Sequence, residues 1–420
     1  MLRGLAFAIV DEADSVFVDE ARTPLILSAA AGDDEEAAMH AQALEIARRL
    51  RQGRDFTLEA LARQITLTPA GRAAVADAAR GLPGLWRIRR AREELARQAL
   101  SALHLFAAGR DYVVIEGTVQ IVDEYTGRVQ PDRSWQGGLH QMIEVKEGLA
   151  TTGRKETLAR ITYQRFFRRY ARLAGMTGTG IELAGGFRET FGLPTVRFPP
   201  HRRRRRRHLA TRFLRDDAAR WQAVAARAAE VHAAGRQVLI GTRSVEASAR
   251  ASAALAARGL AHRVLNARQD KAEAEIVAAA GAAGAITVAT NIAGRGTDIP
   301  LGPGVREAGG LHVILTEMHT AKRIDRQFIG RAGRQGDPGS AQTFVSCEDE
   351  LVKLHAKRII RLVRGMTPST PAQDEISGAA RRRALAIFRL AQRSAEARGR
   401  RMRSEVMRQD DWIEKHLPGF

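Results

Sequence analysis

Cysteine is almost absent from this chain of 420 residues, which contains only Cys347. A single cysteine excludes an internal disulfide framework and a zinc site built from several cysteines. Long hydrophobic runs are missing too. No stretch approaches the ~20 apolar residues that a membrane-spanning helix needs, and the first residues show no signal-peptide pattern. We therefore expect a chain that works in the cytoplasm and holds no zinc.

Acidic residues are in short supply: 47 Asp and Glu face 67 Lys and Arg, which gives a formal net charge of +20. Such a charge attracts phosphate-rich partners, namely nucleic acid, nucleotides or an anionic lipid surface. Abundant arginine also follows from a GC-rich genome, so the charge alone does not choose among them. The hydrophobic fraction of 45% and the length predict a globular protein of two to four domains.

The glycine-rich phosphate loop Gly-x-x-x-x-Gly-Lys-[Ser/Thr] is absent from the sequence. Yet the opening, LAFAIVDEADSVFVDE (5–20), has the form of a buried strand that ends in carboxylates. Asp11 at the end of such a strand suits Mg²⁺, which keeps several of its waters. Glu12 is placed to orient or deprotonate the water that attacks a terminal phosphate. An ordinary acidic turn is the alternative for this motif taken alone.

A glycine-rich segment, ATNIAGRGTDIP (289–300), follows another predicted strand. Gly294 and Gly296 let the backbone approach a ligand closely. Arg295 and Asp298 are expected to point into the same cleft. A glycine-rich turn without a ligand is the alternative.

The segment QFIGRAGRQGD (327–337) carries two arginines and a glutamine at helical spacing. Gln327, Arg331 and Arg334 fall at i, i+4 and i+7, so we expect them on one face of a helix. Two arginines on one face can stabilise the negative charge of a transferring phosphoryl group. A solvated basic face is the alternative, but the glycines between them each cost about 1 kcal/mol in a helix, which favours a function.

The second half of the chain alternates apolar strands with helices, which predicts a parallel, doubly wound α/β sheet. Strands are expected at 237–242, 262–267, 285–290, 310–317 and 341–346. A helix is predicted over 163–175, a linker at HRRRRRRH (201–208), and a long arginine-rich helix from Gly378. The linker is alternatively a binding run for acidic lipid or nucleic acid.

The segment between these parts has α+β character. A helix is predicted at about 87–108, and short strands at 65–68, 112–117 and 119–127. The turn at Glu116-Gly117 predicts a hairpin between the last two strands.

These motifs together resemble the two-lobed RecA-like motor ATPases of helicase superfamily 2. The resemblance rests on Asp-Glu-x-Asp, then Gly-Arg-Gly-Thr-Asp, then Gln-x-x-Gly-Arg-x-Gly-Arg. MTGTG (176–180) is similar to the hydroxyl motif that couples the two lobes in that superfamily. Its Thr177 lies 163 positions after Asp14 (177 − 14), where a helicase has one short crossover unit, so a whole domain is inserted.

The insertion and several longer segments resemble the SecA family, the ATPases of bacterial protein translocation. The segments are VDEADSVFVDEARTPLIL, DYVVIEGTVQIVDEYTGR, GGLHQMIEVKEG, LAGMTGTG, NIAGRGTDIPLG and GGLHVILTEMHTAKRIDRQFIGRAGRQGD. They occur in the order of that family and extend over nearly the whole chain.

The resemblance implies a RecA-like fold with an inserted α+β domain and a C-terminal scaffold helix. The implied parts are residues 1–25 and 156–195 (first nucleotide-binding lobe), 26–155 (preprotein-binding insertion), 196–365 (second lobe) and 366–420 (start of the helical scaffold).

The family's site roles carry over residue by residue, with ATP and Mg²⁺ as cofactors. The implied catalytic residues are Glu12, Arg331 and Arg334; the nucleotide-binding residues are Gly294, Arg295, Gly296, Asp298, Thr177 and Gln327; and Asp11 holds Mg²⁺ through water.

The implied partners are an unfolded preprotein, the Sec channel, the anionic lipid surface and a second copy of the chain; nucleic acid is not expected. The implied location is the cytoplasm and the cytoplasmic face of the inner membrane. Because the phosphate loop is missing, we expect this chain not to hydrolyse ATP efficiently alone. A superfamily 2 nucleic-acid helicase and an ATPase-inactive peptide-binding remnant stay open as alternatives.

Overall fold

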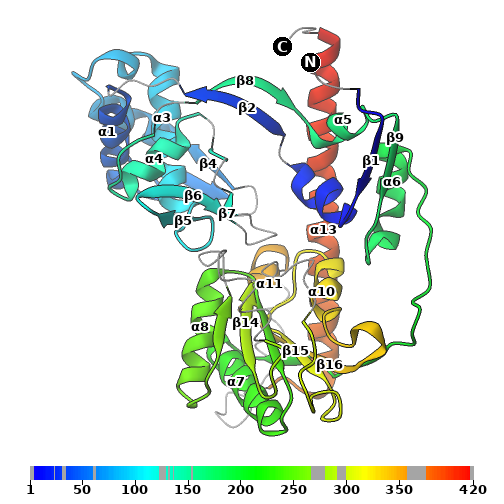
Figure 1. Cartoon of the computed structure of the whole chain (residues 1–420). Helices are drawn as coiled ribbons and strands as arrows, with labels where there is room; N and C mark the ends of the chain where they lie inside the picture. Colours follow the sequence, from blue (N-terminus) through cyan, green and yellow to red (C-terminus); the bar gives the residue numbers. More distant parts are fainter. Residues whose placement is uncertain are drawn as a thin grey trace. The chain divides into compact units, whose positions relative to one another are not determined.

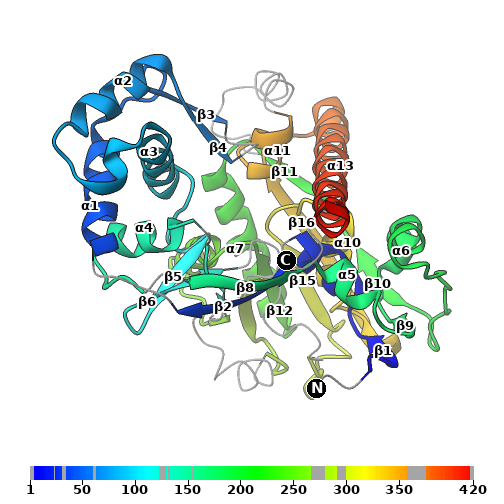
Figure 2. The same cartoon turned by 90° about the horizontal axis from the view of Figure 1, so that it is seen from above.

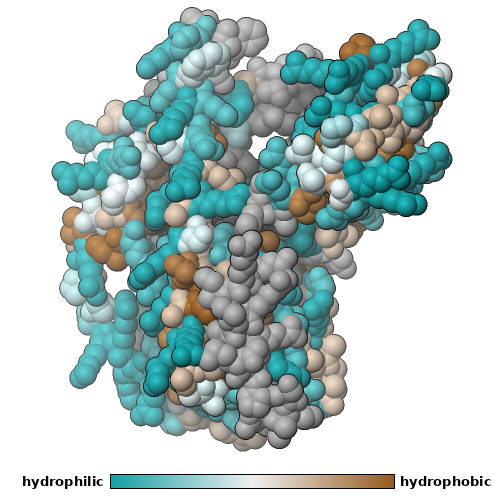
Figure 3. Space-filling model, turned by 180° about the vertical axis from the view of Figure 1, so that it is seen from behind, coloured by the Kyte–Doolittle hydropathy of each residue, from teal (hydrophilic) through white to brown (hydrophobic). Residues whose placement is uncertain are grey.

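The computed structural model divides the chain into two compact units, Met1–Leu27 with Ala159–Phe420, and Ser28–Leu158 (Figure 1). The residues that the structure describes are 4–22, 24–30, 35–59, 63–122, 129–130, 133–135, 137–152, 155–265, 280–290, 299–356 and 375–416. Among them, no helix has the length and apolar character to cross a membrane. Hydrophilic side chains predominate on the face drawn in Figure 3.

A seven-stranded parallel sheet forms the centre of the larger unit. Its order is β10-β16-β15-β12-β14-β13, and β11 also pairs with β16. The strands are β10 (Arg205–His208), β11 (Arg212–Leu214), β12 (Val238–Thr242), β13 (Arg263–Leu265), β14 (Ile286–Thr290), β15 (Leu311–Leu315) and β16 (Pro338–Ser346). The predicted doubly wound α/β fold is confirmed.

Helices bury both faces of this sheet, which explains why β12, β14 and β15 are apolar at nearly every position. On one face, α7 (Asp217–Ala233) and α8 (Val245–Ala256) pack on Val238 and Ile240. On the other, α10 (Lys322–Ile329) inserts Phe328 beside Leu239. Figure 1 shows these helices around the strands.

The end of the chain forms one long helix, α13 (Gly378–His416), as the sequence predicts. Its apolar face, with Phe388 and Ala391 at its centre, packs against α11 (Glu350–His355) and the last residues of β16. This apolar cluster also contains Cys347, which is buried and forms no disulfide.

The opening residues form a short parallel pair, β1 (Phe7–Val10) with β9 (Arg172–Gly175), which Figure 2 shows side by side. Around Phe17 they share a small aromatic core with Phe167, Phe187 and Phe191. The other elements here are η1 (Ser15–Asp19, a π-helical turn), η2 (Glu20–Arg22), α5 (Tyr163–Phe167), η4 (Gly180–Leu183) and α6 (Ala184–Phe191).

Three predictions were wrong in this unit. The helix predicted over 163–175 ends at Phe167, because pairing with β1 makes Arg172–Gly175 a strand. The predicted linker 201–208 contains β10, which extends the edge of the large sheet beside β16. The opening strand is not buried on both sides, since Phe7 and Ile9 are each 58% exposed.

The smaller unit is the α+β part. Glu116 (φ 50°) and Gly117 (φ 74°) form the tight turn of the predicted hairpin, which is confirmed. The elements are α1 (Glu35–Arg49), β3 (Phe56–Glu59), β4 (Gln64–Leu67), α2 (Pro69–Ala78), η3 (Gly84–Arg87), α3 (Arg89–His104), β5 (Tyr112–Ile115), β6 (Thr118–Val122), β7 (Val129–Gln130) and α4 (Leu139–Lys146). The pair β2 (Leu25–Ala30) and β8 (Lys155–Ile161) connects it to the rest of the chain.

Candidate functional site

The carboxylate turn, residues 11–14, follows β1 directly. Glu12 adopts a left-handed backbone conformation (φ 48°), which a non-glycine residue takes only at a cost in free energy. Asp11 Oδ1 accepts a hydrogen bond from the Glu12 N–H at 2.8 Å, and Ser15 N–H donates to the Glu12 carbonyl at 2.8 Å. These bonds hold the chain in the sharp bend that separates the side chains of Asp11 and Glu12 from the strand.

Asp14 joins this turn to the hydroxyl segment, residues 176–180. Its carboxylate is fully buried, and it accepts hydrogen bonds from Thr177 Oγ1 at 2.7 Å and from Thr179 Oγ1 at 2.8 Å. The Ala13 N–H donates to the Met176 carbonyl at 2.9 Å. Thr177 therefore lies beside the carboxylate turn, and one of its contacts there is the buried Asp14.

Helix α10, which packs on the large sheet, contacts the same carboxylates through two of its side chains. Gln327 Nε2 donates to Asp14 Oδ2 at 2.7 Å and lies 3.4 Å from Glu12 Oε2. Arg323, one helical turn earlier, donates to Asp14 Oδ2 at 3.0 Å and also pairs with Asp19. One face of α10 thus contacts the opening residues of the chain through charged and polar side chains.

The π-helical turn explains how Asp14 and Asp19 both reach one guanidinium. Five residues of an α-helix would turn the second side chain about 140° away from the first. The wider π turn, with its i→i+5 bonding, brings residues five apart back to nearly the same face. Asp19 and Arg323 are buried along with Asp14.

The charges of this buried group are balanced by hydrogen bonding. Burial opposes the charge of Arg323, but the carboxylates of Asp19 and Asp14 outweigh it and raise the pKa of the guanidinium. Thr177, Thr179 and Gln327 donate hydrogen bonds to Asp14, so its carboxylate has neutral donors as well as the guanidinium. Removing the guanidinium would take the Arg323 charge away from two buried carboxylates at once, which is expensive.

The arginine turn, residues 330–337, begins where α10 ends at Ile329. Gly333 (φ 66°) and Gln335 (φ 51°) reverse the chain within it, and Arg334–Gly336 form one 3-10 turn, η6. The prediction that Gln327, Arg331 and Arg334 share one helix face was therefore wrong. The glycines that made a helix costly here end it.

The two arginines of the turn differ in how far they are buried. Arg331 is 8% exposed, and its guanidinium carbon lies 5.9 Å from the centroid of the Phe328 ring. Arg334 is partly exposed. Gln327 contacts Glu12, and the arginine turn begins three residues after Gln327 in the sequence. The two arginines are therefore close in sequence to the residue that contacts the carboxylate turn.

Of the residues predicted for a nucleotide site, the structure brings Glu12, Thr177 and Gln327 together, with Asp11 adjoining. Four others lie outside the described residues: Gly294, Arg295, Gly296 and Asp298. Four residues of the buried group were not predicted as site residues: Asp14, Asp19, Thr179 and Arg323. The i, i+4 spacing of Arg323 and Gln327 is the local signal that could have found one of them.

The oxygen atoms of this site fit Mg²⁺ bound to a phosphate. Asp11 is exposed, and its carboxylate is a hard oxygen ligand. Among the described residues, no group of three or more His, Cys, Asp or Glu side chains could hold a metal ion. A magnesium ion at Asp11 would therefore take most of its ligands from water and phosphate, which is the usual arrangement in nucleotide sites.

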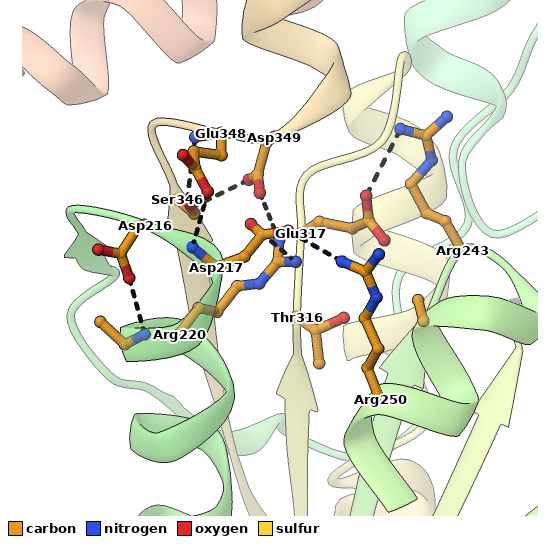
Figure 4. Close-up of polar contacts among 12 residues, drawn as sticks. Asp216, Asp217, Arg220, Arg243, Arg250, Thr316, Glu317, Ser346, Glu348 and Asp349 are labelled. Carbon is orange, nitrogen blue, oxygen red and sulfur yellow. Dashed lines mark hydrogen bonds and ion pairs between the residues drawn. The ribbon is translucent and has the colours of Figure 1, made fainter. Parts of the chain in front are cut away.

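A second polar cluster lies at the carboxyl ends of β15 and β16 and at the start of α7 (Figure 4). Arg220 of α7 pairs with Asp217 at 3.2 Å and with the buried Asp349, which also accepts a hydrogen bond from the Ser346 N–H at 3.2 Å. Burial, with the charge of Glu317, raises the pKa of Asp349, while Arg220 opposes that shift. This cluster fixes the starts of α7 and α11, and its members are engaged with one another.

Two families match this chain, and both are domains of SecA proteins. The family described as SecA DEAD-like domain matches residues 1–188. The family described as SecA P-loop domain matches residues 204–305 and 303–367.

The individual proteins that are similar to this chain are also SecA proteins. Protein translocase subunit SecA 2 of Nitrosospira multiformis is 50% identical over 416 residues, 99% of this chain and 62% of that protein. SecA 2 of Bordetella avium is 52% identical over 351 residues, 84% of this chain and 53% of that protein. SecA 3 of Magnetococcus marinus is 46% identical over 417 residues, 99% of this chain and 63% of that protein. The chain spans about half to two thirds of the length of these relatives, and it belongs to the SecA family of protein translocase subunits.

Proposed function

We propose that this chain is part of a SecA-type motor in which binding and hydrolysis of ATP move unfolded preproteins through the Sec channel. The observation that carries the proposal is Gln327, which contacts Asp14 and Glu12 of the carboxylate turn and directly precedes the arginine turn. This contact supports a site in which the acids of one turn and the guanidinium groups of the other would act on one nucleotide.

The chemistry follows from the positions of these side chains. ATP supplies the phosphoryl group, and Mg²⁺ neutralises part of its charge. Asp11 would hold the metal through water, and Glu12 would orient and deprotonate the attacking water. Arg331 and Arg334 would stabilise the charge that develops on the phosphoryl oxygens. The remaining nucleotide contacts are assigned to Gly294, Arg295, Gly296 and Asp298.

The buried group around Asp14 supplies the coupling in this proposal. Thr177 and Thr179 reach Asp14 from the segment after β9, while Arg323 reaches it from α10. A nucleotide that shifts Glu12 would thus act on both the hydroxyl segment and the helix of the arginine turn. Networks of this kind can have two discrete arrangements, which is what a motor needs.

The parts of the chain receive corresponding roles. Residues 1–25 and 156–195 are assigned to the first nucleotide-binding lobe, 196–365 to the second lobe and 366–420 to the helical scaffold. Residues 26–155 are assigned to preprotein binding, because exposed strand edges accept any sequence through main-chain hydrogen bonds. The motor is placed at the cytoplasmic face of the membrane, where its positive charge suits anionic lipid. A homodimer belongs to the same proposal.

Thermodynamic linkage between two ligands tests this function. A labelled unfolded preprotein with its signal sequence is titrated with the purified chain, with and without ATP and Mg²⁺, and single-stranded RNA is titrated in parallel. We expect preprotein binding whose dissociation constant changes with ATP, by roughly 5- to 150-fold, the usual range for coupled sites. Glu12→Gln should keep preprotein binding and change that response.

The alternatives predict different results. An RNA helicase would bind RNA with an ATP-dependent affinity and show no such response to preprotein. A peptide-binding remnant without ATPase function would bind preprotein with the same affinity at every ATP concentration. Either result would overturn the proposed motor function.

A further inference from the structure

The second half of the run of six arginines between His201 and His208 is unexpectedly part of the large sheet, as strand β10. Strand β10 pairs in parallel with β16, with Arg206 opposite Gly339. Within β10, Arg205 and Arg207 are exposed, whereas Arg206 is half-buried. Because side chains alternate along a strand, Arg206 points to the opposite side from its two neighbours.

Arg206 donates hydrogen bonds to the end of α10 and to the arginine turn. Its Nη1 lies 3.1 Å from the Ile329 carbonyl oxygen and 3.0 Å from the Ala332 carbonyl oxygen. Its Nε lies 3.3 Å from His208 Nε2. A cation at the carboxyl end of a helix satisfies carbonyls that have no partner within the helix, and it complements the helix dipole.

The backbone of the turn also packs directly on the strand. A Cβ atom on Gly333 would lie 2.9 Å from the Arg206 Cβ, and one on Gly336 would lie 3.0 Å from the Arg202 Cβ. The left-handed φ of Gly333 (66°) adds to the requirement for glycine at that position. Arg202 Nη1 also donates to the Gln335 carbonyl at 3.3 Å.

Backbone hydrogen bonds at both ends of the turn contribute to its shape. The Ala332 N–H reaches the Ile329 carbonyl at 3.2 Å, and the Asp337 N–H reaches the Arg334 carbonyl at 2.8 Å. The guanidinium of Arg206 bridges Ile329 and Ala332, which lie on either side of Arg331. Its contacts therefore constrain the backbone from which Arg331 extends.

We propose that Arg206 is a positioning residue for the arginine turn, holding Arg331 and Arg334 where they meet the nucleotide phosphates. Arg202 supports it at the far end of the turn. The role of the turn rests on the proposed function, whereas its anchoring by the strand can be tested separately. The strand β10 is itself part of the large sheet, beside β16, so Arg206 joins that sheet to the arginine turn.

Hydrogen exchange of the full chain, without nucleotide, tests the anchoring. In Arg206→Ala we expect the amides of 330–337 to exchange about tenfold faster, because local opening becomes easier. Arg207→Ala, a neighbour on the exposed side of the same strand, should leave them within about twofold of the wild type. Arg206→Lys keeps the charge and one donor group, so it should restore part of the protection. Unchanged exchange in both Arg206 variants would overturn the proposal.

Nucleotide affinity then tests the consequence for the site. The dissociation constant of a fluorescent ATP analogue with Mg²⁺ should rise about tenfold in Arg206→Ala, with Arg206→Lys between it and the wild type. Arg207→Ala should bind like the wild type. The urea midpoint of the large sheet, followed through Trp221, should stay the same. Equal affinities for Arg206→Ala and Arg207→Ala would overturn the positioning role; a wild-type chain that binds no nucleotide would instead refute the proposed function, with the exchange result still deciding the anchoring.

Discussion

The carboxylate of Asp14 takes part in several of the polar contacts between the opening residues and α10. It is fully buried and accepts hydrogen bonds from two threonines, a glutamine and an arginine. An ionised carboxylate with several donors is stable in a buried site, whereas either partner left alone is not. The arginine in this group, Arg323, is therefore the sharpest point at which to break the contact.

Arg323→Met should destabilise the larger unit by about 3–5 kcal/mol, because it removes a buried guanidinium that pairs with both Asp14 and Asp19. Lys322→Met is the matched control, since it removes one positive charge from an exposed position on the same helix. The measurement is urea unfolding, together with hydrogen exchange of residues 11–19. A loss no larger than that of Lys322→Met would contradict the account of the buried ion group.

His312 makes the second prediction at this scale. It is fully buried in β15, where burial, helped by the charges of Arg227 and Arg236, lowers the pKa of its imidazole to about 3. The unfolded chain binds this proton near pH 6.5, so stability is present above pH 6.5 and is lost as the pH falls towards 3. Its Nδ1 lies 2.7 Å from Ser340 Oγ.

Between pH 7 and pH 5 the wild type should lose about 2 kcal/mol of unfolding free energy more than His312→Gln, at roughly 1.4 kcal/mol per pH unit below 6.5. Urea unfolding at the two pH values gives both numbers. Equal losses in the two proteins would show that His312 does not titrate in this way.

The sequence predicts the site residues that lie within short motifs and misses those defined by distant pairing. Glu12 was predicted from its place after a strand, Gln327 from its spacing to two arginines, and Thr177 from the family resemblance. The structure brings these three residues together, and their roles at a nucleotide stay predictions. The residues of the pair Asp14–Arg323 are 309 positions apart in the sequence, and no local pattern predicts such a contact.

At the scale of elements, the strands of the large sheet were predictable because both faces are covered. Strands such as β14 and β15 are buried at every position, so most of their residues are apolar. Strands β9 and β10 were missed because each is formed by its neighbour, β1 or β16, and neither has an apolar pattern of its own. Tertiary pairing here overrides the local preference.

The contact of α10 with β12 depends on one glycine. A Cβ atom on Gly241 would lie 2.3 Å from the ring of Phe328. Gly241→Ala should therefore cost about 1–3 kcal/mol through overpacking. Adding Phe328→Leu should recover part of that cost, with a coupling energy of at least about 1 kcal/mol in a double-mutant cycle measured by urea unfolding. Strictly additive effects would mean that the helix does not rest on this glycine.

At the scale of the whole molecule, the distance between motifs is the most informative feature of the sequence. The 163 positions between Asp14 and Thr177 led us to expect an inserted domain, and these two residues are nevertheless hydrogen-bonded. The segment Ser28–Leu158 between them is compact by itself. Its preprotein-binding role stays a prediction, because function cannot be inferred from a compact fold alone.

The central claim is that the carboxylate turn and the arginine turn bind one metal–nucleotide complex. Affinity cleavage tests it most directly: Fe²⁺ replaces Mg²⁺ on ATP, ascorbate and peroxide generate radicals at the metal, and mass spectrometry locates the backbone cuts. We predict ATP-dependent cuts both at residues 10–14 and at residues 329–336, and fewer cuts after Asp11→Asn. ATP-dependent cuts at only one of the two segments, or at neither, would contradict the account.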